Sequence, residues 1–481
     1  MSNLALPGNP RYQPKNLRDF FGYDNLFRYV AEVEIATLRT LIEVGIVPAT
    51  EGALLTPELE EKLLGITTTE VDEIERTITK HDIRAWVRSA QSILPAPLRR
   101  WVHIPLTSYD PIDTARTLQF RRAHEKVVSP LVHEVVRIMS EKVREYAEVI
   151  QVGRTHGQHA LPITVGFWLG TTLGRILTNA RQMDACADQL LGKISGAVGA
   201  YNAQAGLGIM DACPEMDFER LVLNKLGLKP GLISTQILPP EGLAYYLFAA
   251  TMLSASFGQL GRDCRHLMRT EIGEISEPFA AGQAGSSTMA NKRNPITLEN
   301  LEGMWLKTKN EYGKVFDTLI SEHQRDLVGS SLARDFPTII VNLVHQLNTL
   351  LRLNDKDESF LQRLTVDVAA CERNFNLQSD RILAEPIYIA LQMAGYEGDA
   401  HELVNRRAMP LVNEDTSLID AIQSLAEGDD SLAAALDSIP GDTFNIFRDP
   451  RSYTGLAYER AMAVYREAHV YGKTMLWRAS P

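Results

Sequence analysis

A loop of small and basic residues, GQAGSSTMANKRNP (282–295), carries groups suited to acid–base chemistry. Small side chains let a backbone approach a ligand closely and change conformation, which suits a mobile flap. Ser286 and Ser287 offer hydroxyls and consecutive backbone N–H donors, and Lys292 adds a positive charge. Pro295 fits the first turn of a following helix, whose N-terminus beside a lysine favours a carboxylate or phosphate. A solvated linker between two helices is the alternative, and composition alone gives it about equal weight.

A second block, GRTHGQHALPITVG (153–166), contains two histidines at the expected start of a helix. His156 and His159 have no third ligand at a matching spacing, so we expect no metal site. A lone histidine is more often a structural hydrogen-bonding residue than a catalyst. The polar neighbours Arg154 and Thr155 favour the functional interpretation here.

Two further blocks combine hydroxyls with charges. In HIPLTSYDPIDT (103–114), Thr107 and Ser108 precede Asp110. The alternative is plain helix capping by Ser108 or Asp110, which is compatible with a functional role. In EHQRDLVGSSLARD (322–335), serines lie between two guanidiniums, which suits a phosphate or carboxylate. The anion-binding set would be Arg325, Ser330, Ser331 and Arg334. The alternative is a surface salt-bridge network of these arginines with Glu322, Asp326 and Asp335.

These blocks need long helices to position them. Apolar residues recur at three- and four-residue steps through 124–150, a stripe more than six turns long, and Pro130 fits a helix beginning near Ser129. We find no convincing succession of period-two strands, so the pattern predicts a bundle of long helices. Similar stretches are 165–195, 241–275, 296–322 and 336–376.

The length of 481 residues predicts more than one domain. A proline-rich segment at 94–111 precedes the long helices, and shorter helices with acidic turns follow residue 372 or so. We therefore expect three parts, at 1–110, 111–371 and 372–481.

The bulk composition excludes several classes of protein. A net charge of −11 disfavours nucleic-acid binding. Four widely spaced cysteines without CxxC spacing indicate reduced thiols in the cytoplasm, with neither zinc nor disulfides. The N-terminus does not resemble a signal peptide. The most apolar segment, 243–261, contains several polar residues and is typical of a buried helix, so we expect no membrane span.

Taken together, the four blocks resemble those of the aspartase/fumarase lyase superfamily and, within it, the adenylosuccinate lyases. Segments 9–36 and 447–459 resemble the ends of those enzymes, so the resemblance covers nearly the whole chain. The loop GSSTMANKRNP is similar to the superfamily's signature loop, with agreement at Gly285, Ser286, Ser287, Met289, Lys292, Asn294 and Pro295.

The resemblance implies an all-α fold of three helical domains. The central bundle would form a twenty-helix core in a homotetramer, with each active site drawn from three subunits. The implied reaction is cleavage of a C–N bond by β-elimination with release of fumarate, most closely adenylosuccinate to AMP in purine biosynthesis. Cleavage of SAICAR to AICAR stays open. We expect a small-molecule succinyl nucleotide as substrate and no cofactor.

The resemblance also assigns roles to individual residues. Ser286 is the expected base, and Lys292 and Asn294 would hold the carboxylate on which charge builds. His156 is the expected acid, with Glu299 as its carboxylate partner.

Other positions match substrate contacts. His81 matches a second histidine that binds phosphate or assists proton transfer. Arg11, Tyr12, Arg325, Ser330 and Arg334 match positions that hold AMP. Further substrate contacts are expected at Thr107, Ser108, Asp110, Thr155, Gln236, Ser287 and Met289.

The chain departs from the family pattern at four places, among them a glycine replaced near Pro105 and an apolar stretch after Gln236 where a more polar one is expected. Ala290 and Asn291 stand where a proline usually follows Met289, and Tyr109 replaces a small residue in the Thr-Ser block. These departures bear on which substrate the enzyme accepts more than on the chemistry of the elimination.

Two alternatives belong to other classes of function. Another superfamily enzyme, such as argininosuccinate lyase or a carboxymuconate cycloisomerase, would have no use for the AMP-phosphate block at 322–335. A non-catalytic helical scaffold would not need Ser286, Lys292, His156 and Glu299 together.

Overall fold

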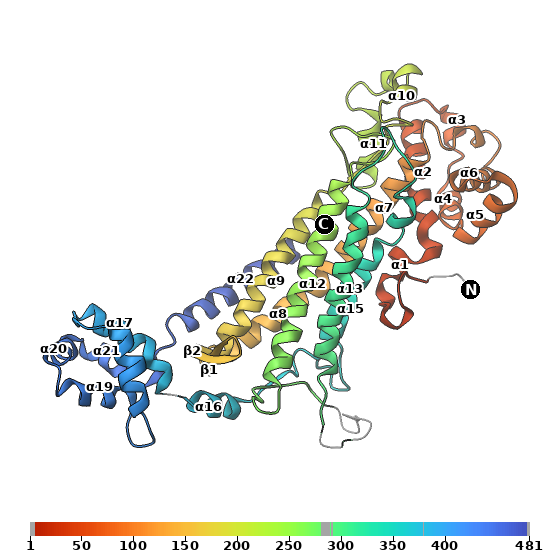
Figure 1. Ribbon diagram of the computed structural model, residues 1–481. Coiled ribbons are helices and arrows are strands. Elements are labelled where there is room, and N and C mark those ends of the chain that lie inside the picture. The colour runs from red at the N-terminus through yellow and green to blue at the C-terminus, as the bar shows by residue number, and fades with distance from the viewer. Residues whose placement is uncertain (1–4, 280–288, 290–291, 379, 479–481) are drawn as a thin grey trace. The chain divides into compact units, whose positions relative to one another are not determined.

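Helices dominate the computed structural model, which describes residues 5–279, 289, 292–378 and 380–478 (Figure 1). The expected all-α fold is confirmed. The long helices are α2 (Leu26–Glu43), α7 (Tyr109–Ala123), α8 (Ser129–Glu145), α9 (Val165–Asp188), α12 (Glu241–Leu267), α13 (Ile296–Phe316), α15 (Pro337–Leu350) and α22 (Ala457–Arg478). No helix in the described ranges has the length and apolar character needed to cross a bilayer.

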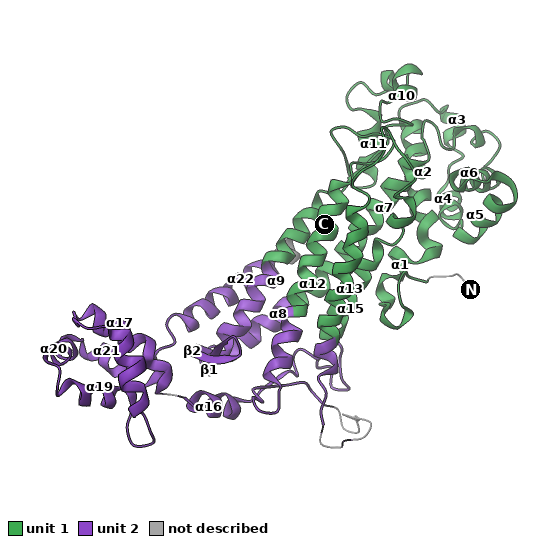
Figure 2. Ribbon diagram, viewed as in Figure 1, with its two compact units in different colours: residues 1–134, 178–258, 300–351 green, residues 135–177, 259–299, 352–481 purple. Residues whose placement is uncertain are grey.

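The chain divides into two compact units (Figure 2). Unit 1 comprises 1–134, 178–258 and 300–351, and unit 2 comprises 135–177, 259–299 and 352–481. The three-part division expected from the sequence stays a prediction.

Unit 1 opens with a group of shorter helices around one apolar core. Trp86, Leu41 and Phe218 are fully buried in it. Local signals fix the helix starts: Thr56 caps α4 ahead of Pro57, and a capping box of Thr67 and Glu70 starts α5. Helices α2, α4 (Pro57–Leu64), α5 (Thr68–Ile74), α6 (Asp82–Ile93) and α11 (Phe218–Lys225) contribute buried residues to this core. The remaining short helices of unit 1 are α1 (Arg18–Phe21), α3 (Ala49–Gly52), α10 (Asn202–Gly206) and α14 (Ser330–Ala333).

Unit 2 contains the one hairpin of substantial length in the described chain. Strands β1 (Ile150–Thr155) and β2 (Gln158–Thr164) pair antiparallel, with a register shift between Val152 and Arg154. The short pairs are β3 (Leu191–Gly192) with β4 (Lys229–Pro230) in unit 1, and β5 (Ile275–Ser276) with β6 (Thr365–Val366) in unit 2.

A separate apolar cluster in unit 2 gathers the last short helices around Ile387, Leu403 and Ile422. These helices are α17 (Ala384–Met393), α18 (Ala400–Glu402), α19 (Leu418–Ala426), α20 (Asp430–Ser438) and α21 (Gly441–Ile446). Helix α16 (Val368–Asn376) packs instead on β1, where Phe375 and Val152 are buried together.

The structure corrects two expectations about local structure. The His156 block forms the hairpin instead of a helix start, because His156 and Gly157 both adopt positive φ (53° and 78°) in a two-residue turn. Helix α9 begins only after Thr164, whose hydroxyl accepts the Phe167 N–H at 3.1 Å. The stretch 336–376 is two helices, α15 and α16, separated by a turn-rich connection.

Candidate active site

Two predicted residues meet where α6 and α7 begin in unit 1. The His81 ring caps α6 by accepting the Arg84 N–H at 3.5 Å, and its Nε2 lies 3.4 Å from the Ser108 hydroxyl. Ser108 makes no capping bond to α7, so the capping alternative is wrong for this serine.

Asp110 anchors the chain around this point. Its carboxylate is fully buried and pairs with the buried ammonium of Lys193. It also accepts the backbone N–H groups of Thr107 (2.8 Å), Ser195 (3.0 Å) and Gly196 (3.2 Å). Asp110 therefore fixes the position of Thr107 relative to the 193–196 segment. Lys193 was not predicted from the sequence, because no local pattern links it to Asp110.

Arg325 is held by neutral groups. Its guanidinium carbon lies 3.4 Å from the centroid of the Tyr109 ring, and its Nη1 donates to Gln236 Oε1 at 2.8 Å. The Gln236 N–H donates to the Gln324 carbonyl oxygen at 3.4 Å, which ties the two segments together. Arg325, Gln236 and the Thr-Ser block, predicted separately, thus share one site.

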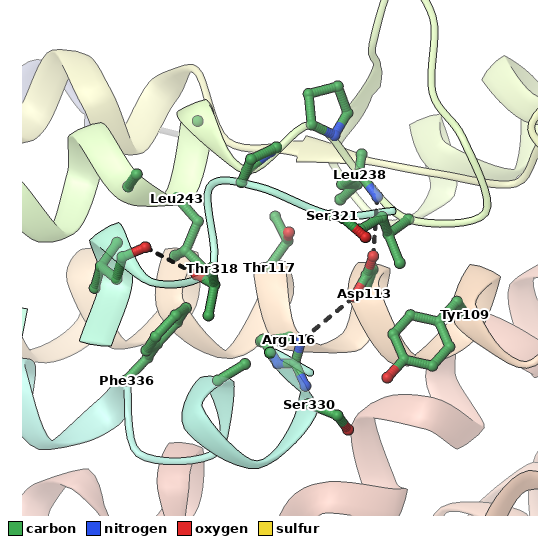
Figure 3. Close-up of a pocket in the computed structure, with 18 of the residues that line it drawn as sticks. Tyr109, Asp113, Arg116, Thr117, Leu238, Leu243, Thr318, Ser321, Ser330 and Phe336 are labelled. Carbon is green, nitrogen blue, oxygen red and sulfur yellow. Dashed lines mark hydrogen bonds and ion pairs between the residues drawn. The ribbon is translucent and has the colours of Figure 1, made fainter. Parts of the chain in front are cut away.

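A cavity of about 140 Å³ lies beside Arg325 (Figure 3). Its walls are mostly apolar, with Leu238, Leu243 and Phe336 among them, while Tyr109 and Ser330 contribute polar atoms. The cavity gives the predicted anion-binding residues a concave setting, as small-molecule sites require.

Asp113 fastens the segment after Gln236 to α7. Its carboxylate accepts the Leu238 N–H at 2.9 Å and lies 3.4 Å from Arg116 (Figure 3). Burial raises the pKa of Asp113, and the Arg116 charge opposes that rise.

The alternative salt-bridge network at 322–335 does not form. Asp326 accepts the N–H groups of Glu322 and Val328, both at 2.7 Å, and Asp335 pairs with Lys314 at 2.9 Å. Within the described residues, neither Arg325 nor Arg334 makes an ion pair.

Arg11 and Tyr12 lie in a short 3-10 helix (Pro10–Tyr12). The Tyr12 ring is 5.2 Å from the His345 ring, and the Lys307 ammonium is 5.6 Å from it. The Arg11 side chain is exposed. In the part of the chain that the structure describes, no hydrogen bond joins either residue to Arg325, Ser330 or Arg334.

The hairpin in unit 2 places Thr155 and His156 at an exposed turn. Arg154 points into the protein instead, where Glu274 holds it through two contacts of 2.6 and 3.1 Å. Gln151 and Asn374 donate to the same buried carboxylate at 2.7 and 2.8 Å. Arg154 is therefore a structural anchor, and its presence does not support a functional histidine in the way the sequence suggested.

His159 faces Arg154 across the hairpin. Burial lowers its pKa, and the positive charge of Arg154 lowers it further. Its Nδ1 has no partner among the described residues. The same residues contain no group of three or more histidines, cysteines or carboxylates arranged to hold a metal.

The loop at 282–295, which the sequence predicts to be catalytic, lies partly outside the described residues, Ser286 and Ser287 included. Lys292 is exposed and its N–H donates to the Met289 carbonyl oxygen at 3.2 Å. Asn294 precedes α13, and Glu299 is exposed on its first turn. Within the described chain no hydrogen bond or ion pair joins Glu299 to His156.

The N-terminus of α13 is not an open anion receptor, which corrects another expectation. The buried carboxylate of Glu277 accepts the N–H groups of Thr297 (3.1 Å) and Leu298 (3.3 Å). The helix dipole is thus already compensated from within the chain. The sequence analysis did not predict roles for Glu274 and Glu277. Their places on either side of the short apolar stretch at Ile275 could have indicated that both carboxylates are buried hydrogen-bond acceptors.

Comparison with known proteins gives this geometry its context. A family model described as lyase matches residues 59–308. The adenylosuccinate lyase of Archaeoglobus fulgidus is 31% identical over 465 residues, which cover 96% of this chain and 98% of the relative. The chain belongs to the adenylosuccinate lyase family. The Pyrococcus horikoshii adenylosuccinate lyase is 32% identical over 427 residues, covering 88% and 90% of the two chains.

Solved structures agree on the fold of this family member. The 3-carboxy-cis,cis-muconate lactonizing enzyme of Pseudomonas putida superposes with a TM-score of 0.77 at 24% identity, covering 96% of this chain and 98% of that one. A fumarate lyase from Mesorhizobium gives 0.76 at 22%, covering 96% and 100%. The chain is a lyase of the aspartase/fumarase superfamily, as the signature loop predicted.

Proposed function

We propose that this enzyme cleaves adenylosuccinate to AMP and fumarate. The observation that carries the proposal is the Arg325 guanidinium, held by Gln236 and Tyr109 with no carboxylate partner in the described chain and lining a cavity with Ser330. An arginine so placed suits a phosphate. Similarity to adenylosuccinate lyases over nearly the whole chain supports the same substrate.

The proposed elimination passes through a dianionic intermediate that the enzyme must stabilise. Ser286 takes the proton from the carbon next to a succinyl carboxylate, and the electron pair delocalises into that carboxylate. Lys292 and Asn294 stabilise the resulting dianion. The C–N bond then breaks as the electrons form the fumarate double bond, and His156 protonates the leaving nitrogen, with Glu299 holding the imidazolium.

The remaining residues bind substrate. Arg325, Ser330 and Arg334, with Arg11 and Tyr12, hold the AMP portion. Thr155, on the hairpin turn, contacts the succinyl carboxylates, and Ser287 and Met289 are further substrate contacts. Thr107, Ser108 and Gln236 contact the substrate in this proposal. His81 lies beside Ser108, and Asp110 accepts the Thr107 N–H.

The active enzyme is a homotetramer in this proposal, with sites shared between subunits. Large apolar side chains are exposed at positions 245, 248 and 252 of α12: Tyr245 (62%), Phe248 (46%) and Met252 (41%). This i, i+3, i+7 spacing forms one helix face, which suits burial against another helix. Glu299 and His156 share no hydrogen bond or ion pair within the described chain, and in this proposal they pair between subunits. We place the enzyme in the cytoplasm, because its four cysteines are free thiols.

A substrate panel tests the proposal. Adenylosuccinate, SAICAR, argininosuccinate and 3-carboxymuconate are incubated with pure enzyme, and products are followed by ultraviolet absorbance and chromatography. AMP should also raise the melting temperature, because a ligand that binds the native state stabilises it. If only argininosuccinate or carboxymuconate is turned over and AMP does not stabilise the enzyme, adenylosuccinate is not the substrate, and the enzyme acts on the substrate of another superfamily member.

A further inference from the structure

We propose that Tyr109 is a positioning residue that fixes Arg325 for the phosphate of the substrate. The inference rests on the proposed function and adds a residue that the family pattern does not supply, since a small residue usually stands at this position. It concerns how tightly the enzyme binds an anionic nucleotide, and not the bond-breaking step.

The contact between the two side chains is close. The guanidinium carbon of Arg325 lies 3.4 Å from the Tyr109 ring centroid, the shortest cation–ring distance among the described residues. At this separation the planar guanidinium stacks on the face of the ring. Gln236 Oε1 fixes one edge of the same group at 2.8 Å. Two contacts therefore set both the plane and the rotation of the guanidinium.

The Tyr109 ring is held in place by the buried contacts at the start of α7. Tyr109 is the first residue of α7, and the next residue is the buried Asp110, with its Lys193 pair and three backbone bonds. One turn further on, Asp113 ties α7 to Leu238, two residues beyond Gln236 (Figure 3). The two groups that hold Arg325 are thus fastened to each other.

This arrangement leaves the charge of Arg325 available. An aromatic face holds a cation without neutralising it and without using its N–H donors, which a carboxylate would do. The nearby carboxylates are occupied: Asp113 by Leu238 and Arg116, and Asp326 by two backbone N–H groups. Arg325 keeps donors for an incoming phosphate, and Ser330 lines the same cavity.

The test compares three substitutions of Tyr109. Y109F keeps the ring that lies over Arg325, so it should raise KM less than Y109S or Y109L does. Y109S restores a small residue and Y109L keeps bulk without a π face; both should raise KM for adenylosuccinate about threefold to thirtyfold, with kcat changed less than twofold. In binding measurements both should weaken AMP but leave adenosine unchanged. Melting temperatures confirm that each variant folds.

A background lacking the arginine provides the second arm. In R325Q, adding Y109S should weaken AMP binding no further, because the partner is gone. Equal KM and AMP affinity in wild type, Y109S and Y109L would overturn the inference, as would a Y109L that behaves like Y109F. A wild type that binds AMP but does not cleave adenylosuccinate would reject the proposed function alone, and the AMP comparison would still decide the role of Tyr109. A wild type that does not bind AMP would overturn both.

Discussion

Arg154 and Glu274 form a buried two-contact ion pair that anchors the hairpin carrying His156. The Arg154 side chain is 13% exposed and the Glu274 side chain 0%. Because Gln151 and Asn374 complete the carboxylate's hydrogen bonds, its charge is fully satisfied inside unit 2. The orientation of the β1–β2 turn depends on this cluster.

We expect Glu274→Ala to lower the free energy of unfolding by about 3–5 kcal/mol, because it leaves the Arg154 charge buried and unpaired. Chemical unfolding of the purified variant measures the loss. Glu141→Ala is the matched control: it removes an exposed ion pair with Arg144 on α8 and should cost less than about 1 kcal/mol. Equal effects of the two substitutions would show that the Arg154 pair is not an anchor.

Glu277 positions the start of α13, and with it Glu299. Glu277→Ala should destabilise the protein by about 1–3 kcal/mol, as loss of a buried acceptor for two N–H groups does, and should also lower kcat. Asp217→Ala removes the cap of α11, a helix that carries none of the proposed catalytic residues, and serves as the control. It should reduce stability while leaving kcat unchanged. A Glu277→Ala enzyme with wild-type kcat would contradict the positioning role.

The buried pair of His103 and Glu34, 2.7 Å apart, predicts a pH dependence of stability. Burial opposes the charged ring, but the Glu34 carboxylate outweighs it and raises the pKa of His103. The folded protein therefore holds the proton more tightly than the unfolded chain. The pair's contribution is full below about pH 6.5 and is lost as pH rises through the folded pKa.

Glu34→Gln removes this contribution. Below pH 6.5 the wild type should exceed it in unfolding free energy by about 1.5–3 kcal/mol, and the difference should shrink at pH 9. Urea unfolding of both proteins at the two pH values gives the comparison. A difference that grows with pH would mean that His103 is neutral in the folded enzyme.

The Ala290-Asn291 departure should have a small kinetic effect. Ala290→Pro restores the family residue and removes no catalytic group, so kcat should change less than tenfold, which is below about 1.4 kcal/mol in activation free energy. Steady-state kinetics on adenylosuccinate decides this. A larger loss would identify the departure as an adaptation to a different substrate.

The sequence predicted the helices well because their apolar stripes are long. It missed the β1–β2 hairpin because alternation is absent: Gln151 and Val152 are both buried, the former to reach Glu274. The register shift at Arg154 disrupts the period further.

Within the candidate site, the residue types identified the four sequence motifs but not the side chains that each motif contacts. Arg325 was identified as an anion-binding residue, whereas its contact with Tyr109 depends on two segments far apart in the chain. The pairs of Asp110 with Lys193 and of Arg154 with Glu274 are equally remote in sequence. Only the folded chain shows that these charges are satisfied internally and that Arg325 is not.

The most direct test of the account is the release of fumarate and AMP from adenylosuccinate by the wild-type enzyme and by Ser286→Ala. We predict equal amounts of the two products from the wild type and a rate lower by about 10²–10⁴ for the variant, the usual contribution of a general base. Wild-type rates in Ser286→Ala, or no fumarate from the wild type, would contradict the account.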